Sequence, residues 1–312
     1  MLLIITPNPA LDRTMVFHGL HLGAVQRTDE VVVAAGGKGF NVARAAQALG
    51  QPALVCAPIG GLTGDLVARL AEAEGLPARW TRHGAGETRT CILLVDRAGG
   101  DATALNEAGP TLVPADWGAY VAEVLALAPG AALAVICGSL PPGVPPEALG
   151  GLVADLGARG IAVLVDSSGP ALAAALAAGP WGIKVNGGEL GAVLGTPVED
   201  VAGAVAALRE LCLRGVSLAA VSLGAQGCVA TDGSSNWWAR PPREPVVSSV
   251  GSGDSLLAGL ATGLLRGMPL PGALQLGVAC GTADALTIGG GLIRQADLSR
   301  LRSAVSVMPL VE

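Results

Sequence analysis

The residues whose types and spacing could perform chemistry lie together at residues 250–255, where two glycines flank Ser252 and Asp254 follows. Glycines let the backbone turn its N–H groups inward, and at the start of a helix such groups bind an anion. Asp254 would then stand beside the anion site, where its carboxylate could accept a proton from an attacking hydroxyl group. On this stretch alone, a glycine-rich turn with an aspartate as helix cap is the commoner interpretation, so the rest of the chain must decide.

The composition excludes several classes of protein. Of the 312 residues, 51% are hydrophobic and only 14% are charged, which favours a large buried core over disorder. The net charge of −6 provides no basic surface for nucleic acid. The longest uncharged run, residues 124–146, is interrupted by prolines, so we expect no membrane partner. Scattered cysteines without a CxxC pair, and an N-terminus that looks like a strand, predict a cytoplasmic protein.

Short apolar strands alternate with helices along most of the chain, which predicts a mostly parallel sheet covered by helices on both faces. The last three helices are expected at residues 254–266, 271–288 and 296–307. Segments drawn from about 13–34 and 79–106 mix polar and β-branched residues, and they predict a small sheet that projects as a lid over a site. We therefore expect a single domain spanning residues 1–312.

Common nucleotide-binding and hydrolase signatures are absent from the sequence. No G-x-G-x-x-G follows the first strand, and the only Gly-Lys pair, at residues 37–38, continues with glycine instead of the serine or threonine of a Walker loop. Neither H-E-x-x-H nor G-x-S-x-G occurs. If the chain binds ATP, another loop must hold it.

Four motifs occur together in an order and spacing that is informative as a set: Asn8-Pro9-Ala10-Leu11-Asp12, Gly36-Gly37-Lys38-Gly39-Phe40-Asn41, Asn186-Gly187-Gly188-Glu189 and Gly251-Ser252-Gly253-Asp254. With further matches at residues 138–144, 166–168 and 221–227, the set resembles the PfkB/ribokinase carbohydrate kinases, and within them the branch acting on phosphorylated hexoses. The resemblance runs from residue 4 to about residue 288. It implies a ribokinase-like α/β fold, a three-layer αβα sandwich with a β-sheet lid, and it implies ATP and Mg²⁺.

The resemblance implies which residues would carry out the phosphoryl transfer. Asp254 would be the catalytic base, and the amides of the three residues before it, Gly251, Ser252 and Gly253, would form the anion hole. The family usually has alanine at Ser252, a mild departure because the backbone does the binding.

On the ATP side, Asn186 and Glu189 are three residues apart and share a helix face. The family uses this pair to organise Mg²⁺ through water, which suits the reluctance of Mg²⁺ to lose its hydration. The usual proline before the asparagine is Val185 here. The ATP-binding candidates are Lys184, Asn186, Ser222, Gly224 and Gly227.

On the sugar side, the resemblance implies hydrogen bonds from sugar hydroxyls to an aspartate, close approach of the ring to paired glycines, and a polar contact from an asparagine. Lys38 and Arg89 suit a sugar that already carries a phosphate, because a free sugar needs no cations. The substrate-binding candidates are Asp12, Gly36, Gly37, Lys38, Asn41, Arg89 and Ser139.

The expected function is ATP-dependent phosphorylation of a ketohexose phosphate, with conversion of fructose 1-phosphate to fructose 1,6-bisphosphate as first choice. By resemblance, Lys38 favours this activity or that of tagatose-6-phosphate kinase, because the 6-phosphofructokinases of the family more often have glycine there. Tagatose-6-phosphate kinase and 6-phosphofructokinase activities stay open, since residues 138–144 and 166–168 also resemble the latter group. A non-catalytic sugar-phosphate sensor on the same fold is the alternative of another class; the presence of Asp254 and the anion-hole glycines argues against it. A homodimer formed through the lid is a further option.

Overall fold

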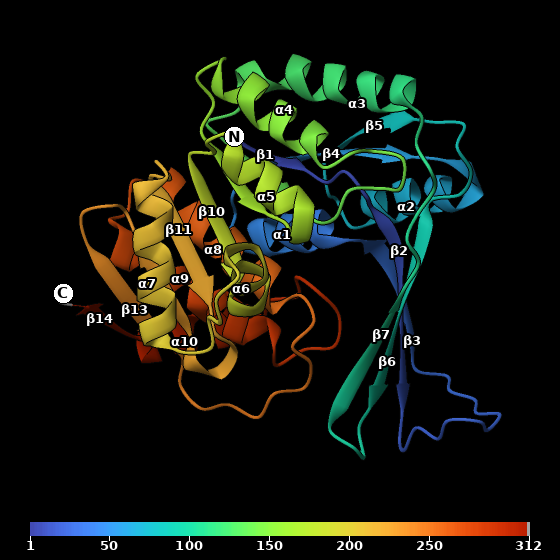
Figure 1. Cartoon of the computed structure of the whole chain (residues 1–312). Coiled ribbons are helices and arrows are strands. Elements are labelled where there is room, and N and C mark those ends of the chain that lie inside the picture. Colours follow the sequence, from blue (N-terminus) through green and yellow to red (C-terminus); the bar gives the residue numbers. More distant parts are fainter. Residues whose placement is uncertain (311–312) are drawn as a thin grey trace.

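Within residues 1–310, which the computed structural model describes, a ten-stranded sheet runs through the body and a four-stranded sheet projects from it (Figure 1). The order of the large sheet is β14-β13-β12-β11-β10-β9-β8-β1-β4-β5, and that of the small sheet is β3-β2-β6-β7. Helices cover both faces of the large sheet, as the sequence predicts.

The large sheet is parallel from β11 to β5 and antiparallel from β11 to β14. Its strands are β1 (Leu2–Ile5), β4 (Ala53–Ile59), β5 (Ala78–Arg82), β8 (Leu133–Cys137), β9 (Val163–Asp166), β10 (Gly182–Asn186), β11 (Leu218–Ser222), β12 (Cys228–Thr231), β13 (Asn236–Arg240) and β14 (Ser306–Leu310). Because parallel strands need crossover connections, helices link most of them.

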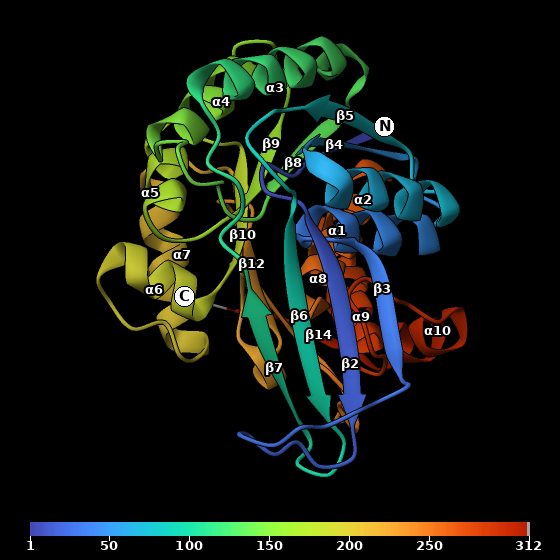
Figure 2. The same cartoon turned by 90° about the vertical axis from the view of Figure 1, so that its right-hand side faces the viewer.

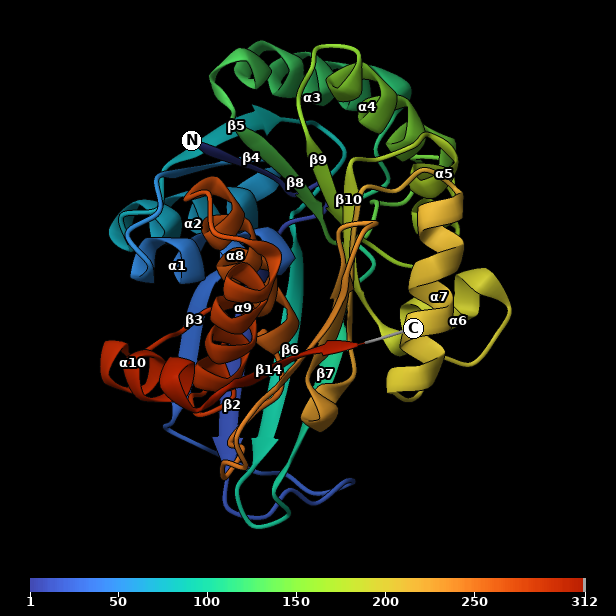
Figure 3. The same ribbon diagram turned by 90° about the vertical axis from the view of Figure 1, so that its left-hand side faces the viewer.

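Two hydrophobic cores lie on opposite faces of this sheet. One is closed by α1 (Lys38–Ala48), α2 (Gly61–Ala73), α8 (Ser252–Leu265), α9 (Leu270–Asp284) and α10 (Gln295–Ala304). The other is closed by α3 (Pro114–Leu127), α4 (Glu147–Gly157), α5 (Gly169–Ala177), α6 (Gly187–Leu194) and α7 (Val201–Leu213), as Figures 2 and 3 show from two sides.

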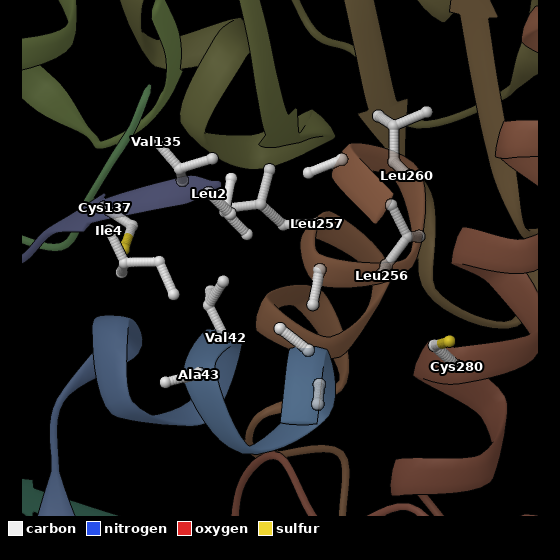
Figure 4. Close-up of a cluster of buried hydrophobic side chains, with 14 of the residues drawn as sticks. Leu2, Ile4, Val42, Ala43, Val135, Cys137, Leu256, Leu257, Leu260 and Cys280 are labelled. Atoms are coloured by element: carbon white, nitrogen blue, oxygen red, sulfur yellow. The ribbon is translucent and has the colours of Figure 1, made fainter. Parts of the chain in front are cut away.

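Strand β1 shows how the sequence divides between the two cores. Successive side chains of a strand point to opposite faces, so Leu2 and Ile4 enter one core while Leu3 and Ile5 enter the other. All four are fully buried. In the close-up of Figure 4, Leu2 lies near Leu257 of α8, which brings the helix that carries Asp254 onto the centre of the sheet. Within the described residues, no helix combines the length and apolar character needed to cross a membrane.

The small sheet consists of β2 (Ala10–Phe17), β3 (Val31–Gly36), β6 (Arg89–Asp96) and β7 (Asp101–Asn106), and it projects from the body as the sequence predicts. One predicted lid segment is wrong: residues 79–82 belong to β5, which pairs in parallel with β4 at the edge of the large sheet. This strand is polar because it is an edge strand, while its Trp80 stacks on the buried Phe40 at 5.7 Å.

A second correction concerns the C-terminal segment. The sequence predicts a helix through residue 307, but α10 ends at Ala304 and β14 follows. Strand β14 adds to the hairpin of β12 and β13, whose position around Asp232 is confirmed. Pairing with a distant strand overrides the local helical pattern here.

Helices α8 and α9 approach closely because glycines face each other between them. A Cβ atom on Gly259 would lie 2.7 Å from the Cα of Gly277, and one on Gly281 would lie 2.7 Å from the carbonyl oxygen of Ser252. The absence of side chains at these points lets the start of α8 dock against the end of α9.

We predict that Gly259→Ala destabilises the protein by about 1–3 kcal/mol, because the added methyl group forces the two helices apart. The matched control is Gly118→Ala in α3, where nothing lies within 4 Å of the added atom. This control should stabilise the protein by up to about 1 kcal/mol through helix propensity. Urea unfolding of both variants measures the difference, and equal effects would contradict the proposed close packing.

Candidate active site

A cavity of about 1590 Å³ opens at the carboxyl ends of the parallel strands and extends to the lid. Ligands of open α/β sheets bind at this edge. Every predicted site residue except Gly36 lines it: Asp12, Gly37, Lys38, Asn41, Arg89, Ser139, Lys184, Asn186, Glu189, Ser222, Gly224, Gly227, Gly251, Ser252, Gly253 and Asp254. Gly36 lies directly behind Asp12, since a Cβ atom there would overlap the Asp12 carboxylate.

Asp254 is buried in the first turn of α8. Burial raises the pKa of its carboxyl to about 6, an effect that Lys38 partly offsets. The side-chain amide of Asn41 donates a hydrogen bond to Asp254 Oδ2 at 2.8 Å. A carboxylate with a pKa near neutrality and a fixed orientation can accept a proton from a hydroxyl group.

The side chain of Asn41 links this carboxylate to a buried ion pair. It accepts a hydrogen bond from Arg44 Nη1 at 3.2 Å, and Arg44 in turn pairs with Glu74. Both ends of the Asn41 amide are therefore engaged within the protein. The structure gives Asn41 the position of a group that orients Asp254, while its contact with the sugar stays a prediction.

The turn that precedes Asp254 has the geometry of an anion site. Gly251 has a φ of 93°, a conformation that favours glycine. Within residues 1–310, the amides of Gly251 and Gly253 have no hydrogen-bond acceptor, whereas Ser252 N donates to Ser249 O over a long 3.3 Å. The ammonium of Lys184 lies 3.0 Å from where a Cβ atom on Gly253 would stand. Free amides, a helix start and a buried cation thus converge on one spot.

Asp166 organises the cations of the cavity, although sequence reasoning assigned it no role. Its fully buried carboxylate accepts hydrogen bonds from Lys38 and, at 2.8 Å, from Lys184. Burial opposes ionisation, but the two lysines lower its pKa. The signal that could have identified it is an acidic residue at the end of an otherwise apolar strand, inside a matching segment.

Lys38 lies between two carboxylates, Asp166 and Glu189, the latter at 3.5 Å. Burial disfavours its charge, yet these carboxylates and Asp254 raise its pKa, so it stays an ammonium ion. Its charge is thus directed towards the middle of the cavity, and its contact with the phosphate of the sugar stays a prediction.

Asn186 and Glu189 form a reciprocal cap at the start of α6. Asn186 Oδ1 accepts from Glu189 N at 2.8 Å, and Glu189 Oε2 accepts from Asn186 N at 3.0 Å. Among the described residues, no group of three or more acidic, histidine or cysteine residues could enclose a metal ion. The donor set therefore fits Mg²⁺ only as an ion that keeps most of its water and phosphate ligands, with Glu189 as its protein neighbour.

Asn8, another residue that the sequence placed in a motif without a role, links the part of the cavity where Arg89 and Ser139 lie. Its Nδ2 donates to Ser139 Oγ at 3.1 Å and to Ala108 O at 3.0 Å, and its backbone carbonyl accepts from Arg89 Nη2 at 2.9 Å. Asp12 accepts from Gly37 N at 3.3 Å, and burial raises the pKa of its carboxyl. Lid and body are therefore connected through these side chains.

The turn between β11 and β12 lines another part of the cavity. Gly227 has a φ of 94°, and a Cβ atom there would overlap the carbonyl of Ala239. Ser222 Oγ donates to Val185 O at 3.4 Å. The indole of Trp238, which the sequence did not single out, also lines the cavity and donates to Gln226 O at 2.7 Å. A flat aromatic residue beside a glycine turn can bind a planar base.

Comparison with known proteins adds independent information. Residues 7–294 match the model of the pfkB family carbohydrate kinases. The chain is 37% identical to the 1-phosphofructokinase of Rhodobacter capsulatus over 304 residues, which cover 97% of this chain and 96% of the relative. It is 31% identical to the 1-phosphofructokinase of Escherichia coli K12, covering 98% and 97% of the two chains.

Solved structures show the same architecture. Phosphofructokinase-2 from Escherichia coli in complex with potassium superimposes with a TM-score of 0.89 and 30% identity, covering 97% of this chain and 98% of that one. The same enzyme in complex with fructose 6-phosphate gives a TM-score of 0.86 and 28% identity, with the same coverage. The ribokinase-like sandwich with its small separate sheet, expected from the sequence, is thereby confirmed.

The raised pKa of Asp254 predicts a stability effect with a definite sign. Its carboxyl titrates near 6 when folded and near 3.8 otherwise, so ionisation destabilises the folded state as the pH rises through this window. We expect Asp254→Asn to stabilise the protein by up to about 3 kcal/mol at pH 8 and by about half of that at pH 5.

The matched control is Asp232→Asn, in the hairpin between β12 and β13. Hydrogen bonds from Ser234 and Ser235 lower the pKa of Asp232 despite its partial burial, so its ionised form stabilises the fold and the variant should lower Tm at pH 8. Thermal unfolding at the two pH values provides the measurement. A Tm of Asp254→Asn below that of the wild type at pH 8 would contradict the conclusion that the ionised Asp254 carboxylate destabilises the folded state.

Proposed function

The chain belongs to the pfkB family of carbohydrate kinases and is an ATP-dependent sugar kinase, and we propose that it phosphorylates fructose 1-phosphate. The observation that carries the proposal is the Asp254 carboxylate at the anion-binding start of α8, in the same cavity as Arg89. The names of relatives 31% and 37% identical over nearly the whole chain support the choice of sugar. The product would be fructose 1,6-bisphosphate.

The proposed transfer uses groups already described. The C6 hydroxyl of the sugar approaches Asp254, which takes its proton while the oxygen attacks the terminal phosphorus of ATP and the bond to ADP breaks. The free amides of Gly251 and Gly253 stabilise the negative charge that builds on the transferring group. Lys184, held by Asp166, places a fixed positive charge behind these amides. Bound Mg²⁺ would neutralise further phosphate charge, with Asn186 and Glu189 as its nearest protein groups.

Nucleotide and sugar occupy opposite sides of the cavity in this proposal. ATP would lie along the turn that holds Gly224 and Gly227, with its phosphates directed at α8. The sugar would lie near Asp12 and Ser139, under the lid. The base then stands where the two ligands meet.

Arg89 is the proposed contact for the phosphate that the sugar already carries. Its guanidinium is held by the carbonyls of Asn8 and Glu107, at 2.9 and 3.1 Å, so its orientation is fixed before substrate binds. Its hydrogen-bond acceptors are thus neutral carbonyls, and the Asp12 carboxylate acts on it only through its charge, so the guanidinium stays able to pair with a phosphate. Fructose 6-phosphate and tagatose 6-phosphate could use the same arginine, and the solved relative with fructose 6-phosphate keeps that alternative open.

The test of the proposal compares kcat/KM for fructose 1-phosphate, fructose 6-phosphate and tagatose 6-phosphate in a coupled ADP assay. Fructose 1-phosphate should be preferred, and Asp254→Asn should lower kcat by at least about 1000-fold because the base is lost. Preference for either 6-phosphate overturns the choice of sugar. If none of the sugars supports ADP formation, a sugar-phosphate sensor becomes the better assignment.

Arg89→Ala should raise KM for the sugar phosphate by about 10- to 100-fold and leave kcat and the KM for ATP nearly unchanged, because one charge-assisted interaction with the phosphate is lost. The control is Arg97→Ala, a lid arginine that pairs with Glu30. Initial-rate kinetics of both variants make the comparison. An unchanged KM in Arg89→Ala would mean that the phosphate is held elsewhere.

Two further expectations stay predictions. The six cysteines are all unpaired in the structure, which supports the expected cytoplasmic location. Leu105, an exposed apolar side chain on the face of the lid opposite that of Asp12, supports the expected homodimer through this sheet.

A further inference from the structure

Asp284, the last residue of α9, is a fully buried carboxylate that the proposed transfer does not use. Its Oδ1 accepts hydrogen bonds from Gly291 N at 2.7 Å and Leu292 N at 3.1 Å, and its Oδ2 accepts from Ser252 Oγ at 3.3 Å. One side chain therefore joins the segment that follows α9 to the first residue of α8.

The joined segment fills the space between the start of α8 and α1. A Cβ atom on Gly291 would overlap the carbonyl of Asn41, and one on Gly290 would lie 2.6 Å from the Asn41 side-chain amide. On its other side, Gly251 is so close that a Cβ atom there would overlap Gly290. Residues 290–291 thus form a wedge that touches the anion-binding turn and Asn41 at the same time.

The wedge also contacts the network behind Asn41. Arg44 Nη1 donates to Gly290 O at 3.4 Å as well as to Asn41 Oδ1 at 3.2 Å. Asn41 accepts from Arg44 and donates to Asp254 at the same time, and these two hydrogen bonds fix the orientation of its amide. A shift of the wedge would therefore release the Asn41 side chain and, with it, the orientation of Asp254.

We propose that Asp284 is a positioning residue: by fixing residues 290–292 against the start of α8, it holds Asn41, and through Asn41 the Asp254 carboxylate, in place for proton transfer. The inference rests on the proposed function, because it takes Asp254 as the base.

A buried carboxylate in this place is unfavourable by itself. Burial raises the pKa of Asp284 to about 7, and the nearby Asp254 adds to the effect, although the Gly291 amide opposes it. A neutral side chain of the same shape would avoid this penalty but would bind the amides less strongly. The tether therefore rests on an oxygen that accepts from the N–H groups of Gly291 and Leu292, which an amide oxygen at the same place can still provide.

The test is kinetic and uses a double-mutant cycle. Asp284→Ala should lower kcat by about 10- to 100-fold, with KM for both substrates within about threefold, because misplacement of the base affects the chemical step and not binding. Asp284→Asn should stay within about threefold of the wild type, since its amide oxygen still accepts from both backbone N–H groups.

Asn41→Ala provides the second side of the cycle. If Asp284 acts through Asn41, adding Asp284→Ala to Asn41→Ala should lower kcat by less than about twofold more. Independent effects that multiply in the double variant would overturn the inference, as would a wild-type kcat in Asp284→Ala. The control is Asp200→Ala, which removes a carboxylate that accepts from Gly203 N at 2.8 Å at the start of α7, away from the cavity; its kcat should be unchanged.

A second measurement separates this inference from the proposed function. Absence of turnover by the wild type on all three sugar phosphates would refute the proposed function. Amide hydrogen exchange would then still test whether Asp284 holds residues 290–292 in place. Asp284→Ala, but neither Asp284→Asn nor Asp200→Ala, should speed exchange of residues 290–292 by at least about tenfold. Unchanged protection in Asp284→Ala would overturn the inference.

Discussion

The arrangement of the cavity depends on the ion pairs that the buried Asp166 carboxylate forms with the ammonium groups of Lys38 and Lys184. Charges taken out of water persist only when they are paired, and removal of one partner leaves an uncompensated charge that is costly. Asp166 and Lys184 come from neighbouring parallel strands, β9 and β10, whereas Lys38 opens α1. Their pairing therefore ties the strand ends to the first helix and fixes two ammonium groups at the cavity.

The start of α8 is arranged around that charge. Free amides face the cavity, and Lys184 stands behind them. Asp254 carries a raised pKa because it is buried, and it is oriented by Asn41. Such an arrangement lowers stability, and it gives the carboxylate that we propose as the base a pKa of about 6. The close approach of α8 and α9, made by glycines, supplies the rigid support that this arrangement requires.

The lid contributes cavity-lining residues that the body does not provide. The body contributes the start of α8 and the glycine turn between β11 and β12, whereas β2 and β6 of the lid contribute Asp12 and Arg89. Asn8, between β1 and β2, joins the two parts through hydrogen bonds to the lid and to the Ser139 loop. If Asp12 and Arg89 bind the sugar phosphate as proposed, substrate choice depends on how the small sheet sits on the large one.

Most of the elements, the layered α/β architecture and the residues that line the cavity are predictable from the sequence. They follow from local signals: the alternation of apolar side chains in strands such as β1, and glycines at fixed positions such as Gly251. Which side chains meet, by contrast, depends on how distant segments pack together. Asp166 and Lys38 are 128 residues apart, and Asn41 and Asp254 are 213 residues apart. The same holds for β5 and β14, which join the large sheet through pairing with other strands, and for Asp284. Contacts of this kind depend on strand order and helix docking, which no local pattern encodes.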